Sequence, residues 1–221
     1  MYAKDIIDTT IQPITYKDNC LTVLSWMEDL KLMHIPVVDD GDFCGLISEA
    51  EIYSLDNPDV LVSEVKDKLK LVAIKETHYI HNVVKMFVVR KLSLLPVLDV
   101  EGKYIGSITQ NSLINALGDI ISAKVAGATI IFEMNNNDFV LSQIANICEE
   151  NDVRILNVFT LLHEDSTKMD VIIKVNTDDV DAIIRTFERY EYSIKATFLK
   201  KDNRDDEMRD RYEYIMNYLN I

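Results

Sequence analysis

The stretch Ile35-Pro36-Val37-Val38-Asp39 recurs 60 positions later as Leu95-Pro96-Val97-Leu98-Asp99. Upstream, the same offset joins residues of matching kind: Ile14 with Ile74, Val23 with Val83, Lys31 with Lys91, and Leu32 with Leu92. Downstream, one extra residue in the second turn makes the offset 61: Gly41, Gly45, Ile47 and Ser48 match Gly102, Gly106, Ile108 and Thr109. A duplicated fold tolerates a single insertion in a turn. The chain therefore contains an internal repeat, which sets the architecture.

Each copy predicts the order strand, helix, strand, turn, strand, helix. In the first copy we expect Asp18 to cap a helix that ends near Met33, with an apolar stripe of Leu21, Leu24, Met27 and Leu30. The later expected elements are strands over 35–38 and 43–47, then a helix over 49–55 capped by Ser48. Their counterparts in the second copy are a helix over 83–91, strands over 94–98 and 104–108, and Thr109 as cap. Neither half can bury both faces of so small a sheet, so one domain is expected over residues 1–120.

Because of these repeated blocks, each copy resembles a CBS motif, and the pair resembles a Bateman module. The resemblance rests on the h-P-V-h-D block, the glycine-containing hairpin and the G-h-h-[ST] strand end, over repeats at about 2–57 and 62–118. It implies a regulatory protein whose clefts bind an adenosine-type nucleotide: AMP, ADP, ATP or S-adenosylmethionine. No cofactor is required. In the family, apolar strand residues enclose the adenine and an [ST]-x-x-D element meets the ribose.

The two copies depart from that element in different ways. The first has Ser48-Glu49-Ala50-Glu51, which keeps a carboxylate on a longer stem, whereas the second has Thr109-Gln110-Asn111-Ser112 and lacks one. The resemblance thus implies a first cleft lined by Ile14, Thr15, Pro36, Val37, Ser48 and Glu51. It implies a weaker second cleft lined by Ile74, Lys75, Pro96, Val97 and Thr109. The alternative is that Ser48 and Thr109 only cap helices and that Glu51 is a surface carboxylate near a helix start.

The pattern changes after Gly127, where strands and helices are predicted in the order βαββαβ of a ferredoxin-like fold. The expected elements are strands over 128–134, 152–161, 169–175 and 192–199, and helices over 139–151 and, capped by Thr177, 178–190. The fold class is therefore α/β (α+β), with a second domain over 125–200. The element order and the run from Glu149 to Ile155 resemble an ACT domain.

The ACT resemblance implies a ligand-binding turn between the first strand and the first helix. This turn has no glycine, and its candidate ligand groups are Asn136, Asn137 and Asp138; Asp138 could instead be an ordinary N-cap. The open antiparallel sheet favours pairing with a second copy, so we expect a homodimer. Residues 201–221 predict an amphipathic helix that docks on its own protein or dimer mate, or recruits a partner, through Met208, Tyr212, Ile215, Met216 and Leu219.

Composition excludes several classes of function. A net charge of −14, with scattered lysines and arginines, argues against nucleic acid as a partner. No apolar run approaches the roughly 18 residues that cross a bilayer, and the first 17 residues do not read as a secretory signal. A cytoplasmic protein without a membrane partner is expected. Cys20, Cys44 and Cys148 have the spacing of neither a disulfide framework nor a zinc site.

No catalytic motif is present, so an enzyme is not expected. His78 and His81 could share a helix face, but no carboxylate or cysteine lies at matching spacing, and no metal site is predicted. The domain content is similar to that of acetoin-utilisation accessory proteins of the AcuB type. We expect a regulatory protein that senses a nucleotide and signals through the ACT-like dimer to an unknown regulated protein. The alternative is a structural homodimer, an interaction scaffold without ligands.

Overall fold

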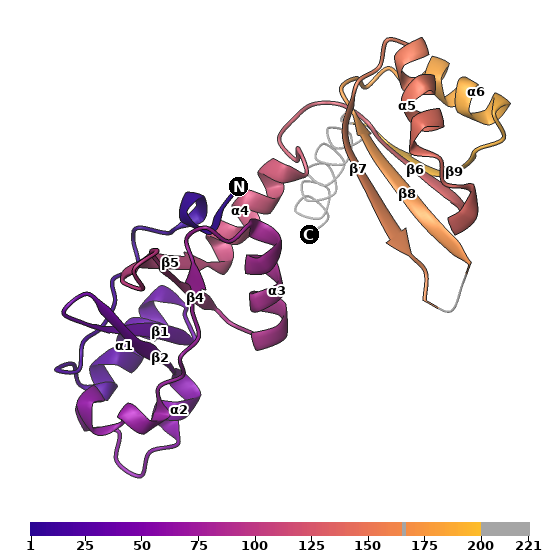
Figure 1. Cartoon of the computed structure of the whole chain (residues 1–221). Helices are drawn as coiled ribbons and strands as arrows, with labels where there is room; N and C mark the ends of the chain where they lie inside the picture. Colours follow the sequence, from indigo (N-terminus) through magenta and orange to yellow (C-terminus); the bar gives the residue numbers. More distant parts are fainter. Residues whose placement is uncertain (165–166, 200–221) are drawn as a thin grey trace, which may run out of the picture. The chain divides into compact units, whose positions relative to one another are not determined.

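The computed structural model describes residues 1–164 and 167–199 (Figure 1). Contacts divide the chain into two compact units, Met1–Leu117 and Gly118–Ile221. The helix predicted over 201–221 lies outside the described residues. Among the helices that the structure describes, none is long and apolar enough to span a membrane.

The first repeat contains α1 (Cys20–Leu30), β1 (His34–Asp39), β2 (Asp42–Ser48) and α2 (Glu49–Tyr53). Strands β1 and β2 pair antiparallel, with a bulge between Val37 and Val38, and Ile14 adds a parallel bridge to Val37. The prediction of Asp18 as the N-cap of α1 is wrong. Asn19 caps the helix by accepting from the Leu21 amide at 2.9 Å, while the Asp18 carboxylate accepts from Thr15.

The second repeat follows the same plan but ends in a longer helix, of 11 residues against 5. It contains β3 (Ile74–Lys75), α3 (Ile80–Arg90), β4 (Leu94–Leu98), β5 (Tyr104–Thr109) and α4 (Gln110–Ile120). The sheet order is β3-β4-β5, with its bulge between Val97 and Leu98, the counterparts of Val37 and Val38. Pro36 lies opposite Leu46 and Pro96 opposite Ser107, at matching register positions. The coordinates therefore confirm the internal repeat.

The segments before each repeat are exchanged between the two repeats. They contain the 3-10 helices η1 (Ala3–Ile6), η2 (Val62–Glu64) and η3 (Lys66–Lys68). The Met1 carbonyl accepts from the Ile80 amide at 3.1 Å, so the amino-terminal segment lies on the second repeat. In the same way, the Val60 carbonyl accepts from the Cys20 amide at 2.9 Å, and Val62 is buried in the core of the first repeat. The repeats are thus interleaved.

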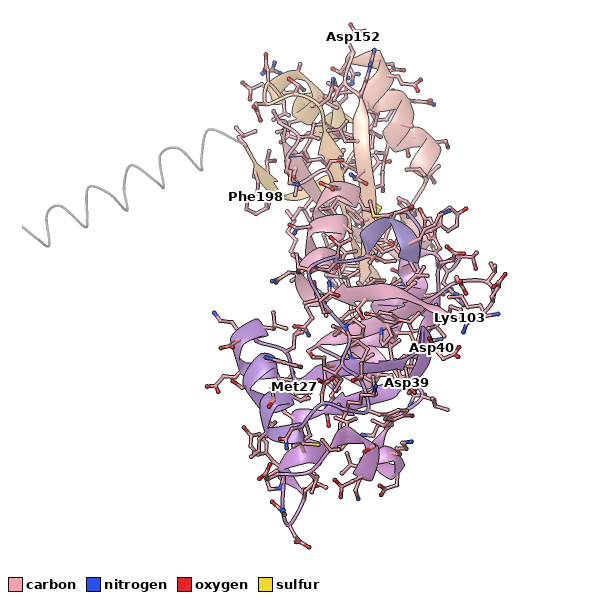
Figure 2. All side chains as sticks on the ribbon, turned by 90° about the vertical axis from the view of Figure 1, so that its left-hand side faces the viewer. Met27, Asp39, Asp40, Lys103, Asp152 and Phe198 are labelled. Atoms are coloured by element: carbon pink, nitrogen blue, oxygen red, sulfur yellow. The ribbon has the colours of Figure 1, made fainter. Side chains whose placement is uncertain are left out.

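The two repeats also contact each other directly. The Met33 amide donates to Ser93 Oγ at 3.0 Å, and His34 Nδ1 lies 3.0 Å from the same hydroxyl. The hairpin turns meet as well: Lys103 Nζ lies 2.8 Å from Asp42 Oδ1, and Figure 2 shows Lys103 beside Asp40. These contacts join both repeats into the single unit Met1–Leu117.

The second unit is an antiparallel sheet with two helices on one face (Figure 1). Its elements are β6 (Thr129–Asn135), η4 (Asn136–Asp138), α5 (Leu141–Glu150), β7 (Ile155–Leu162), β8 (Lys168–Val175), α6 (Asp181–Arg189) and β9 (Ser193–Phe198). The strand order β7-β8-β6-β9 is that of a ferredoxin-like βαββαβ fold and confirms the predicted fold class. The Phe132 and Phe187 rings, 4.6 Å apart, lie in the core between sheet and helices.

Two predicted caps in this unit are wrong. Helix α5 begins only at Leu141, so Asp138 lies in η4, where its carboxylate accepts from Asn135 Nδ2 at 2.8 Å. Helix α6 begins at Asp181, and Thr177 Oγ1 instead accepts from the Asp179 amide in the preceding turn. In both places the polar residue forms a local turn that delays the helix, which is a competing use of such side chains.

Candidate functional site

The start of α2 is a closed polar cluster. Glu51 Oε2 accepts from the amide and the hydroxyl of Ser48, both at 2.8 Å, and Ser48 Oγ accepts from the Glu51 amide at 3.3 Å. Lys70, from the segment before the second repeat, places Nζ 2.6 Å from Glu51 Oε1. Burial alone would raise the pKa of Glu51, but the bonds from Lys70 and Ser48 outweigh it, and the net pKa lies below its ordinary value. Glu51 is thus an ionised cap.

The start of α4 has the same geometry with different residues. Thr109 Oγ1 accepts from the Ser112 amide at 3.1 Å, and Ser112 Oγ accepts from the Thr109 amide at 3.0 Å. Thr109 Oγ1 also donates to Asp8 Oδ2 at 3.0 Å. The carboxylate that position 112 lacks is therefore supplied by Asp8, from the exchanged amino-terminal segment. Hydrogen bonding, chiefly from Thr10, holds the pKa of Asp8 below its ordinary value.

Asp8 and Lys70 occupy equivalent positions in the two repeats. The Asp8 amide donates to the Ser107 carbonyl at 2.8 Å, and the Lys70 amide donates to the Leu46 carbonyl at 3.0 Å. A carboxylate at one helix start thus matches an ammonium group at the other. Sequence reasoning missed both residues, because a contact between a segment and the opposite repeat leaves no trace in local spacing.

A pocket lies beside helix α1 or α3 in each repeat. The larger, of about 450 Å³, is lined by Ala73, Ile74, Lys75, His78, Asn82, Lys85, Met86, Val89 and Arg90. The smaller, of about 330 Å³, is lined by Thr10, Gln12, Pro13, Ile14, Asp18, Trp26, Leu30 and Ile35. The offset of 60 relates Ile14 to Ile74, Asp18 to His78, Trp26 to Met86 and Leu30 to Arg90. The two pockets are therefore equivalent in position and different in chemistry.

The structure separates the residues that the sequence grouped into two clefts. Ile14, Ile74 and Lys75 line the pockets. Pro36, Val37, Pro96 and Val97 are buried in the sheets, and Ser48, Glu51 and Thr109 cap the helices. Thr15 is exposed, and its hydroxyl donates to Asp18 Oδ2 at 3.0 Å.

The pocket beside α3 is positively charged, and of its cations the sequence analysis had named only Lys75 as a site residue. Lys75, Lys85 and Arg90 bring three cations to it, within a chain whose net charge is −14. Ile74, Met86 and Val89 provide apolar surface between them. The signal was present in the sequence: comparing positions 60 apart shows Leu30 replaced by Arg90 and Ser25 by Lys85.

The second unit has its own pocket next to the predicted ligand turn. This pocket, of about 370 Å³, is lined by Glu133, Met134, Asn135, Asp138, Gln143, Tyr190, Glu191, Tyr192 and Ser193. Asp138 is part of the lining, while Asn136 and Asn137 lie beyond it in η4. The Tyr192 hydroxyl donates to Gln143 Oε1 at 3.1 Å.

Comparison with known proteins matches part of the chain to a CBS domain. Residues 62–119 match the family model of the CBS domain. A CBS domain pair/ACT domain protein from Thermotoga maritima is 20% identical, with 54% of this chain and 98% of that chain covered and a TM-score of 0.48. CBSX2, solved in complex with AMP, is 18% identical, covers 54% of this chain and 97% of its own, and has a TM-score of 0.47. The cytosolic domain of the Mg²⁺ channel MgtE, solved with ATP, is 20% identical, with coverage of 52% and 48% and a TM-score of 0.44.

Proposed function

We propose that this protein is a non-catalytic cytoplasmic regulator whose first unit senses an adenosine-type nucleotide. The observation that carries the proposal is the 450 Å³ pocket beside α3, where three cations surround an apolar wall. A nucleotide combines a flat apolar base with an anionic phosphate group, and a pocket of a few hundred Å³ is of the size that binds such ligands. The equivalent pocket beside α1 offers Asp18 and Leu30 in place of His78 and Arg90.

The charge pattern favours binding of phosphate at the second repeat. Arg90 can bind phosphate oxygens through its planar fork of donors, and Lys75 and Lys85 add point charges. The strongly acidic remainder of the chain repels anions at long range, so a local cluster of cations is needed to hold one. Of the eleven predicted cleft residues, Ile74 and Lys75 line this pocket, and Lys75 would contribute a positive charge toward a bound phosphate.

Signalling would follow from a shift between arrangements of the two repeats. The nucleotide can shift such an equilibrium only by the difference in its affinity for the two arrangements. The exchanged segments provide a physical link, because the backbone of His78, in the pocket, accepts from the Ala3 amide at 2.8 Å. Asp8 continues this segment to Thr109 at the start of α4.

Titration of the full chain with AMP, ADP, ATP and S-adenosylmethionine tests the proposal. A ligand at 100 times its dissociation constant should stabilise the protein by about 2.7 kcal/mol, read as a rise in melting temperature. The variant Lys85→Ser with Arg90→Leu gives these two positions the residues found at the equivalent positions of the first repeat, Ser25 and Leu30. It should weaken ATP binding at least about tenfold and leave uncharged adenosine unaffected. Lys17→Ser, at an exposed position outside the pocket, is the matched control.

The competing function is a ligand-free scaffold, and the helix starts favour it. Ser48, Glu51 and Thr109 already satisfy one another or their helices, as ordinary caps do. A scaffold would show no rise in melting temperature with any of the four ligands. Equal weakening of ATP binding by Lys17→Ser and by the pocket variant would also contradict the nucleotide proposal.

We further propose that the ACT-like second unit joins two chains. Strand β7 lies at an edge of the sheet, and Phe159, Leu161 and Leu162 are exposed on it. An exposed apolar edge strand is a template for pairing with a second copy. Sedimentation equilibrium should find a dimer that Leu161→Lys dissociates, and a monomeric parent protein would contradict the proposal.

A further inference from the structure

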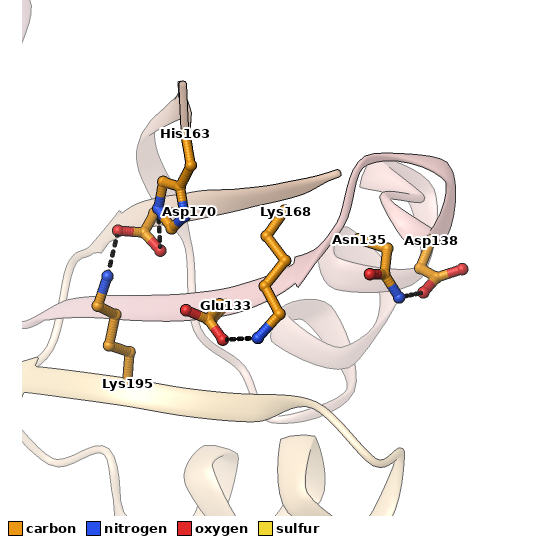
Figure 3. Close-up of polar contacts among 7 residues, drawn as sticks. All are labelled: Glu133, Asn135, Asp138, His163, Lys168, Asp170 and Lys195. Carbon is orange, nitrogen blue, oxygen red and sulfur yellow. Dashed lines mark hydrogen bonds and ion pairs between the residues drawn. The ribbon is translucent and has the colours of Figure 1, made fainter. Parts of the chain in front are cut away.

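One group of histidine and carboxylate side chains in the second unit has the arrangement of a metal site. Among the described residues, Glu133, His163 and Asp170 place one potential ligand atom each within 4.8 Å of one another. They come from three places: β6, the residue after β7, and β8. Figure 3 shows the three side chains converging over the sheet. Sequence spacing gave no sign of this group, since its members lie far apart along the chain.

Two carboxylates face each other directly in this cluster. Glu133 and Asp170 are register partners across β6 and β8, an arrangement that is destabilising for like charges unless cations offset it. Lys168 Nζ lies 2.5 Å from Glu133 Oε2, and Lys195 Nζ lies 2.7 Å from Asp170 Oδ2. The lysines therefore hold one oxygen of each carboxylate, as outer-shell groups orient metal ligands.

The remaining oxygen of Asp170 is the decisive observation. The Asp170 side chain is only 10% exposed, and apart from His163 no described residue offers a hydrogen bond to its buried Oδ1. It lies 3.1 Å from His163 Nε2. Neighbouring ligands around a tetrahedral zinc ion, with bonds near 2.0–2.1 Å, are about 3.3 Å apart. The separation of these two atoms is therefore close to the one that a shared metal ion would impose.

We propose that Glu133, His163 and Asp170 bind a divalent first-row transition metal such as Zn²⁺. One imidazole and two carboxylates form a nitrogen–oxygen donor set that suits these ions, and water would complete the coordination. The ion would link β6, β8 and the end of β7, and thereby stabilise the second unit. This proposal does not depend on the nucleotide proposed for the first unit.

The test uses the full chain, stripped with a chelator and dialysed. Titration with Zn²⁺ by calorimetry, and with Co²⁺ by visible absorption, should give one ion per chain and a rise in melting temperature. His163→Gln removes a partly exposed ligand after the strand and should weaken binding at least about tenfold. Asp170→Asn should do the same, and if that buried change prevents folding, His163→Gln alone decides.

The double variant His78→Gln with His81→Gln is the matched control. It removes one histidine of α3 and one just before the helix, and leaves the cluster intact. It should leave both stoichiometry and affinity unchanged. The proposal is overturned if the protein binds neither ion, if His163→Gln binds as tightly as the parent, or if the control abolishes binding. The last result would assign the metal to the surface histidines.

Discussion

The first and second repeats have the same backbone register and bulge, but they carry opposite charges at equivalent positions. In the first, Glu51 belongs to the helix it caps and Lys70 comes from the exchanged segment. In the second, the helix offers Ser112 and the exchanged segment brings the carboxylate of Asp8. Several buried positions keep apolar residues in both repeats, such as Val23 and Val83, but the buried Leu46 corresponds to the buried Ser107. The divergence is therefore concentrated in polar contacts and in the pocket linings.

Among substitutions that distinguish the repeats, the largest loss in the free energy of unfolding should come from Gly45 and Gly106, which contact the exchanged segments. Gly45 has φ +148°, and a Cβ there would lie 2.7 Å from Leu69 Cβ. Gly106 has φ +144°, and its Cβ would meet the end of the Ile7 side chain. Gly45→Ala should cost about 3 kcal/mol from strain and overpacking, and Gly106→Ala less, because Ile7 Cγ2 can move more readily.

Urea denaturation measures both free energies of unfolding. Gly41→Ala is the matched control, since φ is +82° but the space around it is open, and it should cost only about 1 kcal/mol. If all three changes had equal cost, close packing of the exchanged segments would not contribute to stability.

A smaller difference in the free energy of unfolding is expected when the charge of Glu51 or of Asp8 is removed. Glu51→Gln should cost about 1–2 kcal/mol, because it loses a charged cap and the Lys70 contact, and Asp8→Asn about 0.5–1 kcal/mol. Since the pKa values of both groups lie below their ordinary values, their contribution is present above about pH 4.5 and is lost as the pH falls through the folded-state values. Stability measured against pH should therefore fall less steeply in acid for Glu51→Gln. Equal costs for the two changes would contradict the difference between the sites.

The smallest expected effect is on the pH dependence of stability, through His34, which corresponds to Leu94 in the second repeat. Burial, the main cause, lowers the pKa of His34 below its ordinary 6.5, so the unfolded chain binds more protons than the folded one just below that pH. Stability should therefore decrease as the pH falls below 6.5 and be regained above it. His34→Leu should remove this part of the pH dependence, while Ser93→Ala should retain it. An unchanged profile in His34→Leu would show that another group titrates.

Local patterns predicted the elements but not the contacts between distant segments. The h-P-V-h-D blocks fixed both hairpins. The predicted apolar stripe of α1 was right for Met27, which is buried, and in part for Leu24, but wrong for Leu21 and Leu30, which are exposed. Val23 lies in the core in their place. The boundary at Asp18 was missed by one residue because Asp18 and Asn19 are both good caps, and only the fold decides which is used.

The candidate site was predictable only in part. The resemblance to CBS motifs predicted four strand residues of the second repeat as cleft residues. Ile74 and Lys75 do line a pocket, but Pro96 and Val97 are buried in the sheet. The predicted absence of a carboxylate at Ser112 was right for the local sequence, whereas Asp8, 101 positions before Thr109, supplies one to the Thr109 hydroxyl. Such a long-range contact depends on how the chain folds back, which no periodicity encodes.

The exchange of the segments that precede each repeat has a consequence for how a pair of repeats could originate. Two separate molecules of a single repeat could make the same crossings about a symmetry axis, each completing the core of the other, as in a domain-swapped dimer. Fusing them into one polypeptide makes that association intramolecular and raises its effective concentration to about the millimolar range. Once covalently joined, the halves no longer need identical surfaces, which leaves Asp8 and Lys70 free to acquire opposite charges.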